Sequence, residues 1–313
     1  MYVRAMHQSV LLQAAIDMLA IKPNGIYIDA TFGRGGHARA ILSQLNPTGQ
    51  LIVIDQDLEA IDNAKSQFAD DHRVIICHDS FANLAQLVEK HNLSGQIDGI
   101  LADLGVSSPQ LDQAARGFSF MKAGPLDMRM NQTTGQSVAN WLETVDEVTL
   151  ARIIWQYGEE KFSKRIARAI INARDLKPLE TTTELSEVVQ HCVPKSKKEK
   201  KHPATRTFQA LRIFINQELT ALEQLLADAP PELTPGGRFV VMSFHSLEDR
   251  LVKKAFHRLT TLPDLPRGLP IPDSQIQRDI HFTEVVKKLK ATPEEISLNP
   301  RARSVILRTI EKR

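Results

Sequence analysis

Residues 28–42 read I-D-A-T-F-G-R-G-G-H-A-R-A-I-L, a short apolar run that breaks into glycines and then takes a helical pattern. This order is typical of a strand, a tight turn and a helix, and chains use glycine where the backbone passes very close to another group. The stretch therefore predicts the first strand–loop–helix unit of an α/β domain, with a ligand at the loop.

The chain around this stretch repeats the same order. Apolar runs typical of buried strands lie at 26–30, 51–55, 74–77 and 99–104. Helical patterns lie at 10–19, 36–45, 58–68 and 81–90. Because strands that alternate with helices form parallel sheets, we expect a doubly wound, Rossmann-like sheet.

This order stops after residue 104 and returns near the C-terminus. From about 113 to 204 the chain is polar, helix-prone and almost without strand patterns. A helical period then runs from Phe208 to Leu226, a P-G-G turn at 235–237 leads into a buried strand, and a last strand is expected at 304–309. The sequence thus predicts one α/β domain, residues 1–112 and 207–313, interrupted by an all-helical domain, 113–206.

Composition narrows the class of protein. With 313 residues and a net charge of +2, the chain can bury a sizeable core, and its global charge predicts no partner. The two cysteines, Cys77 and Cys192, lie far apart without the spacing of a zinc site, so no metal is expected. No signal peptide and no membrane-length apolar run is visible, which predicts a soluble cytoplasmic protein.

Three kinds of ligand compete for the glycine loop. A phosphate-binding loop needs Gly-Lys-Ser/Thr, whereas this chain has G-R-G-G-H. A dinucleotide fingerprint needs G-x-G-x-x-G, and Gly33, Gly35 and Gly36 lack the third spaced glycine. S-adenosyl-L-methionine has no pyrophosphate and needs only glycine backbone with a carboxylate for its ammonium or ribose. With Asp29 four residues before Gly33, the pattern favours this third ligand.

Two later strand ends supply carboxylates. The second strand ends in Asp55, where a carboxylate can accept hydrogen bonds from both ribose hydroxyls. The fourth ends in Asp103 and is followed by Ser107, Ser108 and Pro109. Ligands of open parallel sheets bind beyond the carboxyl ends of the strands, so these groups are expected around one pocket. The alternative for Asp103 is a helix or turn cap, and for the serines and proline a plain turn.

Several stretches, spread in order over nearly the whole chain, form one recognisable set: H-Q-S-V-L-L at 7–12, D-A-T-F-G-R-G-G-H at 29–37, D-L-G-V-S-S-P-Q-L-D at 103–112, R-G-F-S-F at 116–120, G-P-L-D-M-R-M at 124–130, Y-G-E-E-K-F at 157–162, H-P-A-T-R-T-F-Q-A-L-R-I at 202–213, F-H-S-L-E-D-R at 244–250 and N-P-R-A-R-S at 299–304. Together they resemble the bacterial small-subunit ribosomal RNA cytosine-N4 methyltransferases, the MraW family.

The resemblance implies a class I S-adenosyl-L-methionine-dependent methyltransferase fold with an inserted helical domain. It also implies methylation of the exocyclic N4 of a cytidine in the decoding region (P-site) of 16S rRNA, within the 30S ribosomal subunit. A homodimer is left open. Carried over by position, the cofactor contacts are Gly35, Gly36, His37, Asp55, Phe81, Asp103 and Gln110, and the loop pattern adds Gly33.

The chemistry points to residues near Asp103. Cytosine N4 is a poor nucleophile because its lone pair is delocalised into the ring. Acceptors around its hydrogens would take up positive charge as it develops. Asp103 and the turn at Ser108 and Pro109 are the candidates for this catalytic role, and the sequence does not separate a cofactor role of Asp103 from a catalytic one.

Other candidate residues keep an ordinary structural alternative. His37 is either a ligand contact or a helix N-terminal residue, and Phe81 either flanks adenine or belongs to the core. A pocket role for residues 245–250 competes with helix capping and an ion pair. We expect RNA backbone contacts at a basic stripe over 161–168, the run 195–206 and the pair at 301 and 303, with a solvated charged face as the alternative.

The prediction of an rRNA methyltransferase has three alternatives. A nicotinamide-dependent oxidoreductase would need the missing fingerprint, and a non-catalytic RNA-binding protein would not need both Asp55 and Asp103. A methyltransferase acting on DNA or on protein amines has to be distinguished by its substrates.

Overall fold

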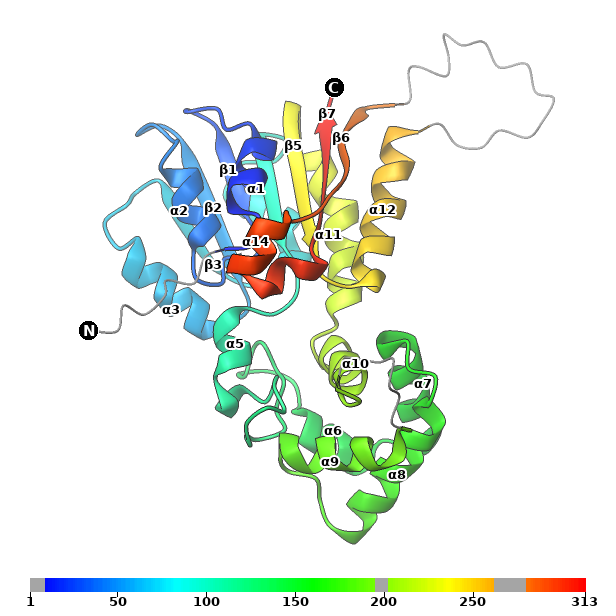
Figure 1. The fold of residues 1–313 in the computed structure, drawn as a ribbon. Helices are drawn as coiled ribbons and strands as arrows, with labels where there is room; N and C mark the ends of the chain where they lie inside the picture. The colour runs from blue at the N-terminus through cyan, green and yellow to red at the C-terminus, as the bar shows by residue number, and fades with distance from the viewer. Residues whose placement is uncertain (1–8, 195–201, 262–279) are drawn as a thin grey trace, which may run out of the picture. The chain divides into compact units, whose positions relative to one another are not determined.

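The computed structural model describes residues 9–194, 202–261 and 280–313. The chain divides into two compact units, which Figure 1 colours along the sequence. The sheet unit consists of Met1–Gly105 with Leu219–Arg313, and the helical unit of Val106–Glu218.

The sheet unit is built on a seven-stranded sheet in the order β3-β2-β1-β4-β5-β7-β6. The first five strands are parallel, whereas β7 pairs antiparallel with both β5 and β6. The strands are β1 Ile26–Asp29, β2 Gln50–Asp55, β3 Val74–His78, β4 Ile97–Asp103, β5 Leu233–Ser243, β6 Phe282–Leu289 and β7 Ile306–Lys312. The parallel order brings the carboxyl ends of β1, β2 and β4 to one edge.

Helices cover both faces of this sheet. On one face Ile28 and Ile100 pack in a cluster with apolar residues of α4, α11 and α12. On the other face Tyr27 and Leu101 pack with α1, α2 and α3. The helices are α1 Leu12–Leu19, α2 Gly36–Leu42, α3 Leu58–Gln67, α4 Leu84–Lys90, α11 Glu218–Glu232, α12 Ser246–Thr260 and α14 Pro293–Leu298, with short 3₁₀ turns η1 Phe81–Asn83 and η4 Pro300–Ser304. Burial on both faces explains why the central strands read as continuous apolar runs.

The helical unit has a core of its own. Ile166 and Ile170, one helical turn apart, are fully buried with Leu150, Leu185 and Leu211. Its elements are α5 Ser108–Asp112, η2 Ala114–Arg116, α6 Val138–Thr144, α7 Glu147–Gly158, α8 Ser163–Leu176, α9 Thr182–Cys192 and α10 Thr205–Ile215. Because α10 supplies core residues and lies within this unit, the helical unit runs beyond the 113–206 expected from composition.

The predicted Rossmann-like sheet with an all-helical insertion is confirmed, and some local predictions are wrong. The single helix expected from Phe208 to Leu226 is two helices, because α10 ends at Ile215 and Gln217 takes a left-handed φ of 51° before α11. β6 and α14 were not predicted. The last strand is β7, which begins two residues later than expected and extends to Lys312.

Candidate active site

The glycine loop leaves β1 and enters α2 through two different uses of glycine. Gly35 adopts a left-handed φ of 72°, and a Cβ there would lie 2.6 Å from the Phe32 ring. A Cβ on Gly36 would lie 1.9 Å from Oγ of Ser9. A side chain at Gly36 would therefore have to displace the Ser9 hydroxyl, which lies before α1.

Asp55, at the end of β2, is tied to this loop. Its Oδ2 accepts a hydrogen bond from the Gly33 N–H at 2.8 Å, and its Oδ1 accepts one from the Asp57 N–H at 2.9 Å. Burial raises the pKa of Asp55 to about 6, although both backbone hydrogen bonds oppose the shift. A carboxylate has about four lone-pair directions, so acceptor capacity for a ribose hydroxyl remains.

Asp103, at the end of β4, is held through its backbone while one carboxyl oxygen stays unbonded. Its N–H donates to Oγ1 of Thr31 at 2.6 Å. Its Oδ1 is buried and has no hydrogen-bond partner among the described residues. Burial, followed by the charges of Asp29 and Glu248, raises the pKa of Asp103 to about 8.

Asp29, the carboxylate that the loop pattern suggested for the cofactor, was not among the predicted site residues. This last residue of β1 is 1% exposed, and its Oδ1 accepts from the Thr31 N–H at 3.2 Å. Burial, with a smaller contribution from Asp55, raises the pKa of Asp29 to about 7. The signal was present, because a carboxylate at the carboxyl end of a buried parallel strand lies at the ligand edge.

The three aspartates share one face of the sheet. Side chains alternate along a strand, so Asp29 lies on the face of Tyr27, Asp55 on that of Val53 and Asp103 on that of Leu101. Tyr27, Val53 and Leu101 all pack on the side of α1, α2 and α3. The parallel register therefore gathers three carboxyls, which we call the acidic cluster, beside the glycine loop.

His37 lies in the first turn of α2, next to the acidic cluster. His37 is only 4% exposed, and its Nδ1 lies 3.8 Å from Oδ2 of Asp103. Burial lowers the pKa of His37 to about 4, partly opposed by a hydrogen bond with the Val10 backbone, so the imidazole is neutral near pH 7. Its Nε2 has no hydrogen-bond partner among the described residues.

Side chains from α2 and α3 brace the outer side of the loop. The Arg34 guanidinium pairs with Glu59, and Arg39 donates to Gln67. The Arg34 carbonyl accepts hydrogen bonds from Arg39 at 3.0 Å and from Gln67 at 3.3 Å. These residues were not predicted, since nothing in their local sequence distinguishes them from solvated charges.

The remaining predicted residues fall into two groups. Phe81 begins the turn η1 directly after β3 and is partly buried against the core of the sheet unit, and its role toward adenine stays a prediction. Ser108, Pro109 and Gln110 belong to the helical unit, where they form the first turn of α5. There the Gln110 side chain caps the helix by accepting from the Ser107 N–H at 2.9 Å.

Residues 245–250 were predicted either to line the pocket or to form a helix cap and an ion pair. Glu248 accepts from the Phe244 N–H at 2.8 Å and forms a capping box with His245 at the start of α12. Asp249 pairs with Arg308 of β7 through two contacts of 2.8 and 3.1 Å. Capping and the ion pair are thus both present, and Glu248 in addition places its charge near Asp103.

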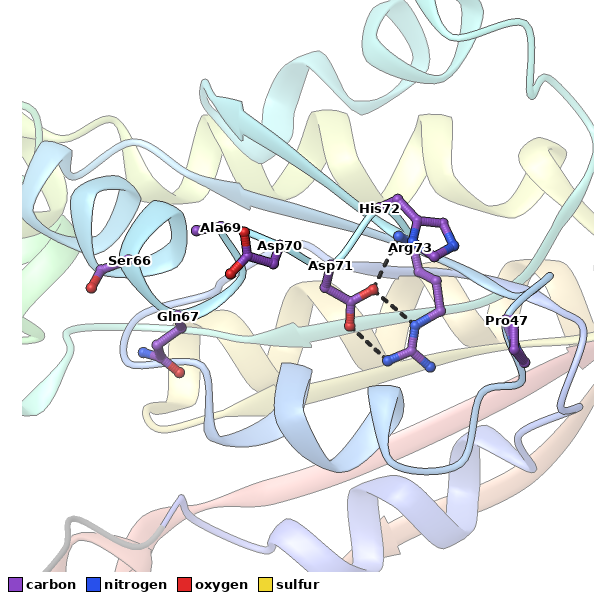
Figure 2. A pocket seen from close by; sticks show the side chains of 8 residues that line it. All are labelled: Pro47, Ser66, Gln67, Ala69, Asp70, Asp71, His72 and Arg73. Carbon is purple, nitrogen blue, oxygen red and sulfur yellow. Dashed lines mark hydrogen bonds and ion pairs between the residues drawn. The ribbon is translucent and has the colours of Figure 1, made fainter.

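A pocket of about 480 Å³ lies elsewhere on the sheet unit, and Figure 2 draws the side chains that line it. It lies near the amino ends of the strands, because Arg73 directly precedes β3 and Pro47 precedes β2. Within it, Asp71 is paired with Arg73 at 2.6 Å, which lowers the pKa of Asp71. This pocket is therefore separate from the acidic cluster at the carboxyl edge.

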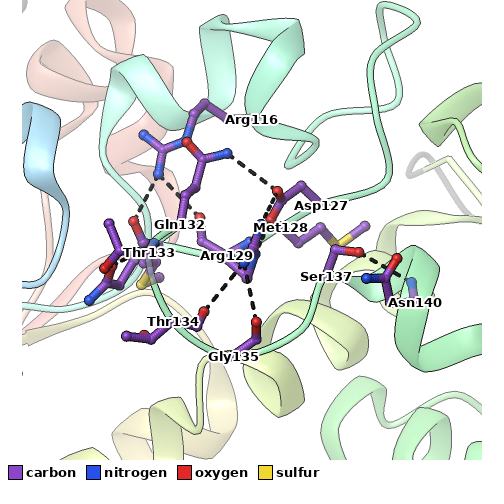
Figure 3. Close-up of polar contacts among 12 residues, drawn as sticks. Arg116, Asp127, Met128, Arg129, Gln132, Thr133, Thr134, Gly135, Ser137 and Asn140 are labelled. Carbon is purple, nitrogen blue, oxygen red and sulfur yellow. Dashed lines mark hydrogen bonds and ion pairs between the residues drawn. The ribbon is translucent and has the colours of Figure 1, made fainter.

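The G-P-L-D-M-R-M motif forms a compact network in the helical unit (Figure 3). Asp127 binds the Arg129 guanidinium through two contacts of 2.8 and 2.9 Å, and Arg116 donates to the carbonyls of Arg129 and Met130. Between them Met128 is fully buried with a left-handed φ of 61°. Such a conformation costs on the order of 1 kcal/mol in a non-glycine residue. The surrounding hydrogen bonds and the burial of Met128 offset this cost, so the motif stabilises the backbone of the helical unit here.

The predicted basic stripe lies on and just before α8. Lys161, Lys164, Arg165 and Arg168 are all exposed, and Arg168 pairs with Glu147 at 3.3 Å. Most of the basic run 195–206 lies outside the described residues. No described helix is long and apolar enough to span a lipid bilayer.

The residues of the carboxyl edge fit S-adenosyl-L-methionine, which carries a positive sulfonium and a positive ammonium. Three carboxyls, of which Asp29 is buried and Asp55 and Asp103 are partly buried, can balance that charge, and the unpartnered atoms of Asp103 and His37 are available to a ligand. An opposite charge nearby favours the ionised form of a carboxyl, so binding of a cation would offset part of the cost of burying the acidic cluster.

The chain is similar to known methyltransferases. The model of the MraW methylase family matches residues 4–313. A relative from Pseudoalteromonas atlantica, "Ribosomal RNA small subunit methyltransferase H", is 52% identical over 306 residues, which are 98% of each chain. A solved structure of a putative rRNA-methylase from Clostridium thermocellum covers 98% of this chain and 100% of its own, with 12% identity and a TM-score of 0.45. A TM-score this low adds nothing to the assignment.

The class I methyltransferase fold predicted from the sequence is confirmed, as is the resemblance on which it partly rested. The family model spans almost the whole chain, and the relative matches end to end. This chain belongs to the MraW methylase family.

Proposed function

We propose that this chain transfers a methyl group from S-adenosyl-L-methionine to the exocyclic N4 of a cytidine in the decoding region (P-site) of 16S rRNA, within the 30S subunit. Family membership and the name of the 52% identical relative support rRNA of the small subunit as substrate. The observation that carries the choice of an amine is Asp103, whose buried Oδ1 has no partner among the described residues.

The cofactor would supply a methyl group activated by its sulfonium. Gly33, Gly35 and Asp55 would hold it at the glycine loop, and Asp29 adds negative charge to the same edge. The task left to the protein is to align the acceptor nitrogen with the methyl group, at about 3–3.5 Å.

Asp103 would bind the acceptor amine. An ionised carboxylate accepts hydrogen bonds from the two N4 hydrogens, favours a pyramidal nitrogen and stabilises the positive charge that develops on it. Asp103 can also accept the proton that the methylated nitrogen must lose. A carboxyl with a raised pKa suits that transfer, because a general base works best when its pKa lies near the working pH.

The helical unit would supply affinity for RNA through its basic stripe. The target base must leave any stack to reach a pocket, at a cost of a few kcal/mol unless the RNA is already open. Contacts of Lys and Arg with phosphates provide binding energy that does not depend on sequence.

The test is methyl transfer to 30S subunits and to naked 16S rRNA, with mass spectrometry of nuclease fragments. We expect one methyl group on one cytosine of a decoding-region fragment. Methylation of another nucleotide type, or of DNA or protein instead, would overturn the proposal. We also expect Asp103→Asn to reduce kcat by about 100-fold or more while the Kd of the cofactor changes by less than about threefold. Equal losses in both would remove Asp103 from the chemistry.

A further inference from the structure

Trp155 is an exposed aromatic side chain on α7 of the helical unit. It is 63% exposed, although tryptophan is usually largely buried. The other tryptophan of the chain, Trp141, is only 8% exposed and packs against the ring of Phe214. Among the described residues, no aromatic ring or cation stacks on Trp155, and no acceptor binds its indole N–H. The core of the helical unit therefore does not explain this side chain.

The surface around Trp155 carries cations that are not balanced by carboxylates. Arg152 lies one turn before Trp155 on the exposed face of α7. Lys164 and Arg165 are exposed on α8, and none of these three cations forms an ion pair within the described part of the chain. Unbalanced positive charge next to an exposed aromatic ring is the combination with which proteins bind single-stranded nucleic acid.

The packing of α7 against α8 brings the ring toward the basic stripe. A short link joins the two helices, and they run antiparallel, because Arg174 near the end of α8 donates to the Val145 carbonyl just before α7 at 2.6 Å. Glu147 pairs with Arg168 of α8 at 3.3 Å and belongs to the same row of α7 as Trp155, about 12 Å along the helix. On an antiparallel neighbour, this step leads from Arg168 toward the beginning of α8, where the basic stripe starts.

We propose that Trp155 is a stacking platform for an unpaired nucleobase of the rRNA substrate, and that Arg152 and the basic stripe hold the phosphates that flank this base. This inference rests on the proposed function, because it needs rRNA as the substrate, and it names the side chain of the helical unit that contacts a base. Stacking on an aromatic ring accepts any base, since every base has a flat face.

A second copy of this chain is the other occupant that an exposed tryptophan can bind. A two-fold contact uses the same surface on both copies. Arg152, Lys164 and Arg165 of one copy would then lie against those of the other, and like charges in close contact oppose association. The charge of this surface therefore favours a polyanion over a second copy.

The binding test compares Trp155→Ala, which removes the ring, with Trp155→Phe, which keeps one. For a decoding-region fragment of 16S rRNA, we expect the alanine variant to raise Kd by about 5- to 100-fold, because the stacked base loses its platform. The phenylalanine variant should recover most of the affinity. Leu176→Ala, which truncates another exposed apolar side chain at the far end of α8, is the matched control and should leave Kd within about twofold.

Salt dependence separates stacking from charge. The slope of log K against log salt should be the same for the wild type and Trp155→Ala, because no cation is removed. Arg152→Ala should lower the slope by about 1, because one phosphate contact is lost.

Tryptophan fluorescence gives a readout that needs no turnover. The chain has only two tryptophans, and a base stacked on an exposed indole quenches its emission. The rRNA fragment should therefore quench the wild-type protein and protect it from acrylamide. In Trp155→Phe the remaining emission comes from the buried Trp141, and the fragment should change it little.

Three results would overturn this inference even if the protein methylates cytosine in 16S rRNA. They are an unchanged Kd in the alanine variant, a quench that persists in Trp155→Phe, and a loss of self-association in sedimentation with unchanged affinity for RNA. The last result would assign Trp155 to a contact between copies. If the alanine variant fails to fold, the fluorescence of the wild type and of Trp155→Phe still decides. Methyl transfer to an acceptor other than rRNA would instead overturn the proposed function.

Discussion

Replacing Asp103 by asparagine tests whether the acidic cluster holds a protonated acid in the cofactor-free protein. Burial, with the charges of Asp29 and Glu248, raises the pKa of Asp103 from 3.8 to about 8. Between about pH 5 and 7 the folded protein therefore keeps a proton that the unfolded chain has lost. Because the folded state binds more protons, the free energy of unfolding decreases as the pH rises.

The size of the effect follows from this one proton. Its contribution to stability is complete below the unfolded pKa of 3.8 and is lost as the pH rises through about 8. Between these two pKa values, the free energy of unfolding that this proton contributes changes by about 1.4 kcal/mol per pH unit, or by about 3 kcal/mol between pH 5 and 7. The free energy of unfolding of the wild type, minus that of Asp103→Asn, should fall by this amount.

The assay is urea unfolding of both cofactor-free proteins at several pH values, with a ¹³C NMR titration of the aspartate carboxyls. Asp71→Asn is the control, because the Arg73 hydrogen bond lowers the pKa of Asp71. The difference in free energy of unfolding between wild type and Asp71→Asn should therefore not vary between pH 5 and 7. Parallel stability curves for wild type and Asp103→Asn would refute the reasoning. So would a carboxyl titration in which no signal assigned to Asp103 moves above about pH 6.

Two further perturbations test other parts of the structure. Gly36→Ala should lower the free energy of unfolding by about 1–3 kcal/mol in thermal unfolding, because its Cβ would lie 1.9 Å from Oγ of Ser9. Adding Ser9→Gly should restore most of that loss, and a failure to do so would contradict the steric reason. Replacing Lys164 and Arg165 by Ala should lower the slope of log K against log salt by up to about 2 in binding to a 16S rRNA fragment, whereas Lys177→Ala, already paired with Glu184, serves as the control. An unchanged slope would exclude this stripe from the RNA contact, and the lysines at 197, 198, 200 and 201, outside the described residues, would be tested next.

The strands of the sheet were predictable because both of their faces are covered. A strand buried on two sides reads as a continuous apolar run, and glycines or polar turns separate one run from the next. The wrong helix from Phe208 to Leu226 has the opposite cause. Its 3.6-residue period continues through a break at Gln217, and a single left-handed residue leaves no trace in the spacing of apolar side chains.

The edge strand β6 escaped prediction for a related reason. Only its first residue, Phe282, is buried, and the following positions are largely exposed. A strand that buries so little has neither the continuous run of a central strand nor a clean alternation, so its pairing with β7 decides its structure. Such pairing joins residues that no local pattern connects.

The residues of the acidic cluster could be predicted from the local sequence, whereas their protonation could not. Asp55 and Asp103 were predicted as site residues because each ends an apolar run, and Asp29 satisfies the same rule. Their common face follows from the register, since Asp29 pairs with Leu101 on one side and with Val53 on the other. Strand parity then places the three carboxyls together, and their closeness raises the pKa of Asp29 and the pKa of Asp103 beyond what burial alone would do. A sequence can thus indicate which residues meet at the edge of the sheet, whereas the protonation of the group depends on distances that only the folded chain defines.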